Sequence, residues 1–366
     1  MRFNHANVLG IETSCDDTGI AIVSTDKKIY FENVKSQAWF HSECGGIVPW
    51  VAKTMHLDNI IPLTIQVMNQ SNLKMNDIDY IAVTHCPGLV ISLDVGIQFA
   101  KYLSTKFQKP VIPIHHMRAH ALIGSLLNNL SYPFLTLLIS GAHCIFAIAH
   151  TANDFSLIGT CKDNAPGDVF DKIYRELNLK NSSLYSHLPC GAAVELCAEK
   201  ANKENRIKNK FDRLNRKSSN CDASFSGIMS QHVYWINEMK QKKQYDNESQ
   251  IPNESSEIAY SLQKEITEKL QVNLSKAIQF CKYSEICHNI SVSQIVVSGG
   301  VACNKFILNG LKKVTDYYEM QIISVPKKYC TDNGTMIAWN GCCIINENLS
   351  IINDLNPLPR FYFNLG

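Results

Sequence analysis

The stretch VLGIETSCDDTGIAIV, residues 8–23, places a turn of small, hydroxyl and acidic residues between two strand-like apolar runs. This pattern predicts a β-hairpin whose turn can present backbone N–H groups to a phosphate. Residues 134–149, FLTLLISGAHCIFAIA, have the same arrangement around the turn SGAH. Taken singly, each such segment is more often only a turn, but the matched pair predicts a duplicated unit with two phosphate-binding turns.

The elements that follow each hairpin come in the same order. After the first hairpin we expect a strand, a helix, a strand, a helix and a strand at residues 29–34, 51–68, 80–84, 93–107 and 111–114. After the second we expect a strand, a mostly helical insertion, a strand, a helix, a strand and a helix at residues 156–159, about 165–290, 294–298, from 304, 321–325 and from 334. This order predicts an α/β fold with two lobes, 1–130 and 131–366, around a central cleft.

Composition and charge limit the class of protein. The chain has 366 residues, of which 45% are apolar and 19% charged, so it can bury a large core and is neither disordered nor fibrous. A net charge of +2 excludes a globally basic nucleic-acid coat and leaves a local patch. The densest candidate is residues 200–217, with eight Lys or Arg against Glu204 and Asp212. The alternative is a solvated helix face.

The cysteines and the apolar runs indicate a soluble protein of a reducing compartment. The 14 Cys show no C-x-x-C spacing, and several lie inside apolar runs, so we expect reduced core thiols. Residues 134–149 are interrupted by Thr136, Ser140 and His143 and predict two buried strands, not a membrane span. No secretory signal is apparent, and the residues before Val8 are too few for an Arg-rich transit peptide.

Two histidines have a spacing suited to one metal ion. His116 and His120 follow the predicted strand 111–114 and are four residues apart, which places them on one face of a helix. Asp332, before the last predicted helix, is the best third ligand, and two His with one carboxylate leave positions open for substrate. Core or surface histidines remain the alternative. A metalloprotease is excluded because Met117 stands where that motif has Glu.

Two further turns lead into predicted helices. In VSGGVACN, residues 297–304, two glycines let a ligand approach a helix N-terminus, and Asn304 could read a base or ribose edge. The alternative is a turn shaped only for packing. Residues 163–172, DNAPGDVFDK, gather three carboxylates at a Pro-Gly turn, where Asp168 could simply cap the helix.

Taken together, these segments resemble the tRNA threonylcarbamoyltransferase family of TsaD-type proteins, and more closely its mitochondrial branch. The resemblance runs from Val8 to about Ile345 and rests on GIETSCDDTGIAI (10–22), GGIVPWVAKTMH (45–56), PGLVISLDVG (87–96), IPIHHMRAHAL (112–122), LLISGAHC (137–144), DNAPGDVFDK (163–172), SFSGI (224–228), VSGGVACN (297–304) and CTDNGTMIAW (330–339). It implies the fold of actin, sugar kinases and heat-shock ATPases. It also implies transfer of a threonylcarbamoyl group from threonylcarbamoyl-adenylate to the exocyclic amine of the adenosine beside the anticodon.

The resemblance also implies roles for particular residues. One divalent ion per subunit, Fe, Zn or Mg, would be held by His116, His120 and Asp332. The adenylate would be contacted by Leu138, Ile139, Ser140, Gly141, Ala142, Asp171, Gly191 and Asn304. Glu12 would accept the amine proton or only orient its turn. The chain departs from the usual pattern where Ala142, Cys190 and Cys86 replace glycines and where Arg118 replaces an acidic residue.

The implied partners are tRNA and an adenylate made by a separate synthase. Whether the chain also pairs with a second copy in a homodimer is left open by the sequence. The implied location is mitochondrial, or otherwise cytoplasmic, with no membrane association. Two other classes share part of the pattern. An ATP-binding phosphotransferase or ATPase of the same fold would need the hairpins but not the two histidines, and a non-catalytic binding module would need no competent metal site.

Overall fold

The computed structural model describes residues 5–44, 46–202, 220–242, 254–283, 292–349 and 355–359. The basic run at 200–217 therefore lies almost entirely outside the described residues. The chain divides into two compact units. Unit 1 comprises Met1–Tyr132, Ala149–Ser156 and Val325–Gly366, and unit 2 comprises Pro133–Ile148 and Leu157–Ser324.

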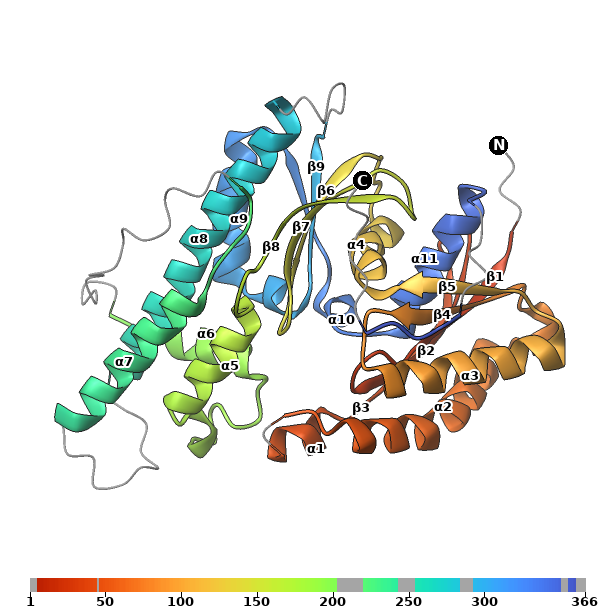
Figure 1. The fold of residues 1–366 in the computed structure, drawn as a ribbon, viewed down its shortest axis with the longest axis horizontal. Helices are drawn as coiled ribbons and strands as arrows, with labels where there is room; N and C mark the ends of the chain where they lie inside the picture. Colours follow the sequence, from red (N-terminus) through yellow and green to blue (C-terminus); the bar gives the residue numbers. More distant parts are fainter. Residues whose placement is uncertain are drawn as a thin grey trace. The chain divides into compact units, whose positions relative to one another are not determined.

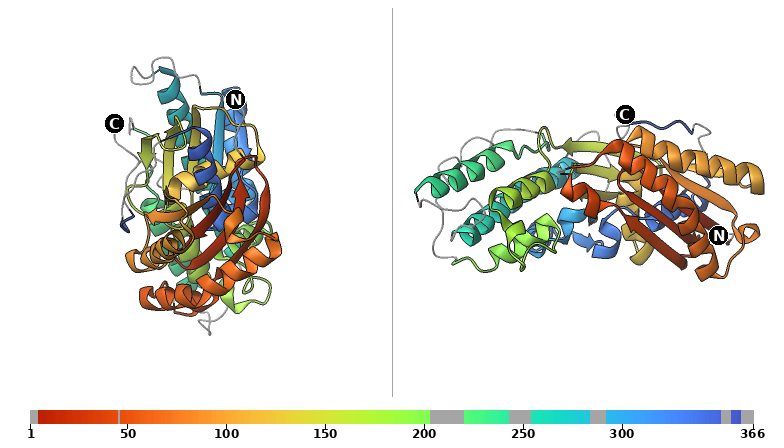
Figure 2. Two further views of the ribbon diagram at one scale, coloured as in Figure 1. Left: turned by 90° about the vertical axis from the view of Figure 1, so that its right-hand side faces the viewer. Right: turned by 90° about the horizontal axis from the view of Figure 1, so that it is seen from below.

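Unit 1 contains the first hairpin in a mixed sheet. The described strands follow the order β3-β2-β1-β4-β5, with bounds Ile29–Ser36, Asp17–Ser24, Asn7–Glu12, Tyr80–Cys86 and Val111–His115. β1 pairs antiparallel with β2 and parallel with β4. One face is covered by α2 (Pro49–Ser71) and α3 (Val90–Phe107), and the other by α4 (His116–Leu127) and α11 (Gly334–Asn346) (Figures 1 and 2). The short helices α1 (Ala38–Glu43) and α10 (Lys327–Cys330) and a 3-10 turn at Met75–Asp77 complete the unit.

Unit 2 repeats this plan. Its described strands follow the order β8-β7-β6-β9-β10, with bounds Phe155–Thr160, Cys144–Ala149, Phe134–Ile139, Gln294–Ser298 and Gln321–Ser324. The insertion between β8 and β9 contains α5 (Pro166–Glu176), α6 (Cys190–Ala198), α7 (Ser226–Lys242) and α8 (Ser255–Tyr283), and α9 (Lys305–Tyr317) joins β9 to β10. Two 3-10 turns lie at Leu179–Asn181 and Gly300–Cys303. The matching strand orders confirm the duplicated α/β fold.

The last helix packs against the first unit. A Cβ on Gly10 would lie 2.3 Å from the Gly334 carbonyl oxygen, so α11 touches the backbone of β1. The sequence divides the chain into lobes 1–130 and 131–366, whereas this contact places residues from Val325 onward with unit 1. The reason is that α11 has its apolar face against β1 and β2, although it follows unit 2 in the chain.

The described cysteines are all free thiols, and Cys144, Cys281, Cys342 and Cys343 are buried. No helix in the described part of the chain has both the length and the apolar character needed to cross a bilayer.

Candidate functional site

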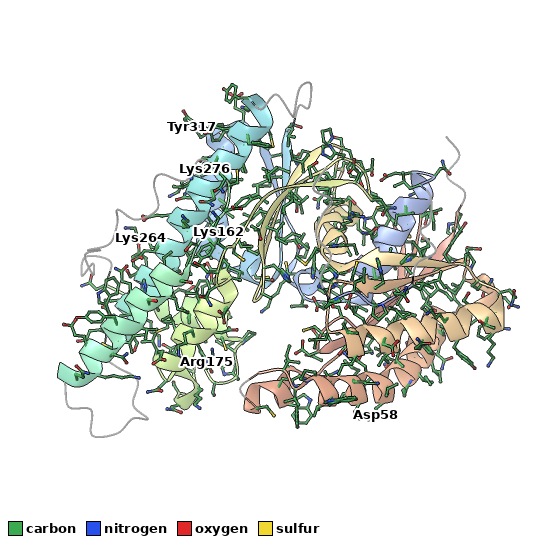
Figure 3. The ribbon with its side chains drawn as sticks, viewed as in Figure 1. Asp58, Lys162, Arg175, Lys264, Lys276 and Tyr317 are labelled. Atoms are coloured by element: carbon green, nitrogen blue, oxygen red, sulfur yellow. The ribbon has the colours of Figure 1, made fainter. Side chains whose placement is uncertain are left out.

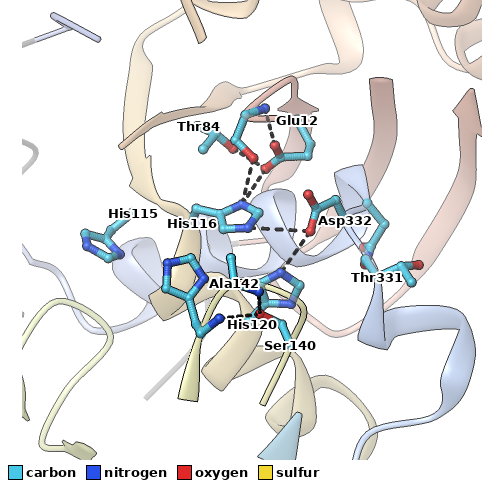
Figure 4. Close-up of polar contacts among 12 residues, drawn as sticks. Glu12, Thr84, His115, His116, His120, Ser140, Ala142, Thr331 and Asp332 are labelled. Atoms are coloured by element: carbon cyan, nitrogen blue, oxygen red, sulfur yellow. Dashed lines mark hydrogen bonds and ion pairs between the residues drawn. The ribbon is translucent and has the colours of Figure 1, made fainter. Parts of the chain in front are cut away.

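The three predicted metal ligands converge in unit 1. His116 and His120 lie one turn apart at the start of α4, with ring centroids 4.7 Å apart. Asp332 lies in the segment between α10 and α11, and its Oδ1 is 3.5 Å from His116 Nε2 and 3.1 Å from His120 Nε2 (Figure 4). One ligand atom from each residue lies within 4.8 Å of the other two. The side chains therefore form one cluster, as their spacing and the resemblance predict.

Glu12 is the second partner of His116. It is fully buried at the end of β1, and its Oε2 is 3.1 Å from His116 Nδ1. Oε2 also accepts a hydrogen bond from the Thr84 hydroxyl at 2.6 Å, and Oε1 accepts from the Ser14 backbone N–H at 2.5 Å (Figure 4). Both carboxylate oxygens are thus engaged inside the protein.

The two carboxylates dominate the electrostatics of His116. Burial alone would lower the pKa of His116, but the charges of Asp332 and Glu12 outweigh burial and raise it to about 9. The same charges favour any cation at this place, whether a proton or a metal ion. With His116 protonated, both ring nitrogens donate, Nδ1 toward Glu12 and Nε2 toward Asp332. If a metal ion replaced the Nε2 proton, Glu12 would keep the remaining proton on Nδ1 and leave the Nε2 lone pair for the ion.

The donor set fits a divalent metal ion. Two imidazole nitrogens and one carboxylate oxygen form the mixed ligand set that borderline divalent ions take, with positions left for substrate. His120 Nδ1 is buried and has no hydrogen-bond partner among the described residues. The Glu12–His116 contact is the carboxylate–imidazole arrangement common behind metal ligands.

The second hairpin lies in unit 2 and has an ordered, open tip. The Ser140 hydroxyl accepts hydrogen bonds from the backbone N–H groups of Ala142, at 3.3 Å, and His143, at 3.1 Å. Gly141 and Ala142 are exposed, and a Cβ on Gly141 would meet nothing within 4 Å. This leaves room for a ligand at the tip. Leu138 and Ile139 are buried in β6, so only their backbones could reach a ligand.

Asp171 and Gly191 are brought together by α5 and α6. The Asp171 carboxylate is hydrogen-bonded to the thiol of Cys190, the residue before Gly191. Burial raises the pKa of Asp171, and the Cys190 hydrogen bond offsets part of that shift. A Cβ on Gly191 would meet nothing within 4 Å, so its backbone is open to a ligand.

Asn304 has a structural partner. Its Oδ1 accepts from the Ile307 N–H at 3.0 Å, so Asn304 caps α9. It follows Gly299, whose φ of 98° suits glycine and whose added Cβ would lie 2.3 Å from the Ile139 carbonyl oxygen. Gly299 is thus needed where the turn passes the end of β6, whereas a Cβ on Gly300 would meet nothing within 4 Å. The cap leaves the amide nitrogen of Asn304 with a long 3.5 Å contact to Gln263 Oε1.

Sequence reasoning missed part of the network around Glu12. Thr84, at the end of β4, and Ser14, in the first turn, both bond to Glu12 or His116, with Ser14 Oγ 3.2 Å from His116 Nδ1. Thr84 lies near the carboxyl end of a predicted parallel strand, where α/β proteins place functional groups. That position is the sequence feature from which its part in the site could have been predicted.

The chain matches known proteins over most of its length. The sequence model described as "TsaD: tRNA N6-adenosine threonylcarbamoyltransferase" matches residues 28–339. The mitochondrial tRNA N6-adenosine threonylcarbamoyltransferase of Homo sapiens is 39% identical over 358 residues, which cover 97% of this chain and 85% of the relative. The tRNA N6-adenosine threonylcarbamoyltransferase of Wolbachia pipientis is 34% identical over 354 residues, 97% of each chain.

A solved structure supports the fold independently. T. kodakarensis HypF aligns with a TM-score of 0.54 at 11% identity, covering 96% of this chain and 49% of that one. At this identity the likeness concerns the fold alone. The family model and the full-length relatives, by contrast, carry the sequence relationship, and the chain belongs to the tRNA N6-adenosine threonylcarbamoyltransferase family.

Proposed function

We propose that this protein transfers the threonylcarbamoyl group from threonylcarbamoyl-adenylate to the exocyclic amine of the adenosine beside the anticodon, in tRNAs that read codons beginning with A. The observation that carries the proposal is the family match over residues 28–339. The alternative of an ATPase or phosphotransferase of the same fold is not favoured, because the full-length relatives are named as tRNA transferases.

His116, His120 and Asp332 would hold one divalent ion. When bound, such an ion supplies Lewis-acid polarisation of a phosphate or carbonyl oxygen. Glu12 would act as a positioning residue, because its buried oxygens are already bonded to Ser14 and Thr84 and lie against His116. A carboxylate so engaged is poorly placed to take a proton from a tRNA amine.

The hairpin tip would bind the phosphate of the adenylate through the backbone N–H of Gly141 and, in exchange for its long 3.3 Å bond to the Ser140 hydroxyl, that of Ala142. Asp171, Gly191 and Asn304 would contact the nucleoside, and the backbones of Leu138 and Ile139 would form the floor under the Ser140 turn. In acyl transfer from a mixed anhydride, the nucleoside phosphate leaves with negative charge. Preorganised N–H groups stabilise that charge as it develops.

The substrate tRNA needs a basic surface. The run at 200–217 remains the leading candidate from sequence. Within the described part of unit 2, Lys264 and Lys276 lie along α8 (Figure 3), but Lys264 pairs with Glu268 at 3.5 Å, so this helix adds little net positive charge. The mitochondrial names of relatives in Rattus norvegicus and Homo sapiens support a mitochondrial location. The adenylate would come from a separate synthase.

A homodimer is supported by one helix face of unit 1. Trp50, Leu57, Ile61 and Ile65 recur along α2 at near-helical intervals and are 69%, 53%, 53% and 55% exposed. The helix has only Lys53 and Asp58 as charged residues, and Asp58 is labelled on it in Figure 3. A second copy of the chain would bury this apolar face, and the few charged residues of the helix would not oppose that contact.

The test of the proposed function is mass analysis of nucleosides from an anticodon-bearing tRNA incubated with the protein and separately made threonylcarbamoyl-adenylate. The wild type is expected to form threonylcarbamoyladenosine, and His120→Ala is expected to lose both bound metal and product. His5→Ala, which removes an exposed imidazole elsewhere in unit 1, is the matched control. Product formation by metal-free His120→Ala would contradict the proposed metal role.

A further inference from the structure

The third proposed metal ligand, Asp332, lies on a different kind of backbone segment from the two histidines. His116 and His120 are held by the same helix, α4. Asp332 lies in the short non-helical segment between α10 and α11. A ligand on such a segment keeps its place only if the surrounding side chains hold the segment.

The segment is fixed on its C-terminal side by α11. Asn333 caps this helix by accepting a hydrogen bond from the Met336 N–H at 2.9 Å, and its Nδ2 donates to the Thr331 carbonyl at 2.7 Å. A Cβ on Gly334 would lie 2.6 Å from the Ala21 nitrogen, so the first turn of α11 lies directly on β2. The residue after Asp332 is therefore well anchored.

Glu32 ties both sides of the segment to the sheet. It lies on the edge strand β3, opposite Ala21 in register, and its side chain is only 13% exposed. Its Oε2 accepts a hydrogen bond from the Thr335 hydroxyl, three residues after Asp332. Its Oε1 pairs with the Lys328 ammonium and accepts from the Tyr329 hydroxyl at 3.3 Å, on the other side of Asp332.

We propose that Glu32 is a positioning residue that holds Asp332 in place and thereby sets the affinity of the metal site. The inference rests on the metal role proposed for His116, His120 and Asp332. One carboxylate thus bridges Lys328 and Thr335, on either side of Asp332. Its loss would free the segment on the N-terminal side of Asp332, at Lys328 and Tyr329, and would remove one of several ties on the C-terminal side, while leaving α4 unchanged.

The test is a Co²⁺ titration of the purified, metal-free full chain, followed by the visible absorption of the bound ion. Glu32→Gln keeps the shape of the side chain but removes its charge and one acceptor. We expect a dissociation constant for Co²⁺ about 10- to 100-fold higher than that of the wild type, with altered absorption bands. Glu319→Gln, the same substitution on the surface of unit 2, is the matched control and is expected to bind like the wild type.

His120→Ala separates this inference from the proposed function. If the wild type binds Co²⁺, His120→Ala does not, and Glu32→Gln binds with wild-type affinity and spectrum, the metal site stands and the role of Glu32 is overturned. A lower thermal midpoint with unchanged Co²⁺ affinity overturns it equally, because that result describes a purely structural residue. Absence of Co²⁺ binding by the wild type would overturn both the proposed metal site and the role of Glu32.

Further variants cover the case in which Glu32→Gln does not fold. Lys328→Met and Thr335→Val each remove one contact of Glu32 and keep the others. Each is expected to weaken Co²⁺ binding less than Glu32→Gln does. Wild-type affinity in both variants would overturn the inference.

Discussion

At the scale of single residues, burial supports the positioning role that we propose for Glu12. A fully buried carboxylate with bonds from Ser14 and Thr84 and a contact to His116 has no oxygen free for substrate. Glu12→Gln is expected to raise the dissociation constant for metal about tenfold, because the charge behind His116 is lost. Metal titration beside single-turnover kinetics checks this. A large loss of turnover with unchanged metal affinity would instead indicate a proton-transfer role.

His232 provides a pH-dependent contribution to stability. Its side chain is fully buried on α7, Nδ1 donates to the Ile228 carbonyl at 2.8 Å, and burial lowers the pKa to about 4. The unfolded chain, with a pKa near 6.5, binds the proton more readily, so stability falls as pH drops from 6.5 toward 4. Relative to His232→Gln, the wild type is expected to lose up to about 1.4 kcal/mol more per pH unit. Urea unfolding across this window measures the difference, and parallel curves would contradict it.

At the scale of elements, the start of α9 combines a helix cap with a proposed ligand contact. Asn304→Ala removes the cap to Ile307 and is expected to cost about 1 kcal/mol of unfolding free energy. Asn304→Ser keeps a capping oxygen but removes the amide, so it should retain stability and weaken adenylate binding. Calorimetry with the free adenylate and thermal unfolding distinguish the two effects. Normal adenylate affinity in Asn304→Ser would make Asn304 a cap only.

At the scale of the whole molecule, the apolar face of α2 predicts self-association. Replacing Leu57 and Ile61 by Asp places charge in the middle of that face and is expected to convert a dimer into a monomer. Their exposure means that the fold should lose little stability. Light scattering after size exclusion measures the mass. A wild-type monomer, or a double variant that remains dimeric, would contradict the proposal.

The sequence by itself determined the elements and their repetition. The hairpins at residues 8–23 and 134–149 and the strands and helices after them depend on periodicity and turn chemistry that act over a few residues. The one-turn spacing of His116 and His120 is local in the same sense. These features therefore appear in the structure almost where the pattern places them.

Only the tertiary structure decided which residues from distant parts of the chain contact one another. His120 contacts Asp332 across 212 residues, and His116 contacts Glu12 across 104. No local pattern encodes either pairing, nor the tie from Glu32 to Thr335, 303 residues away. Glu12 meets His116 because β5, which leads into α4, lies in the same sheet as β1. Asp332 and Thr335 reach their partners because the glycines of β1 and α11 allow that last helix to pack directly on the first sheet. Close packing between distant segments, not propensity, brings Asp332 to the two histidines.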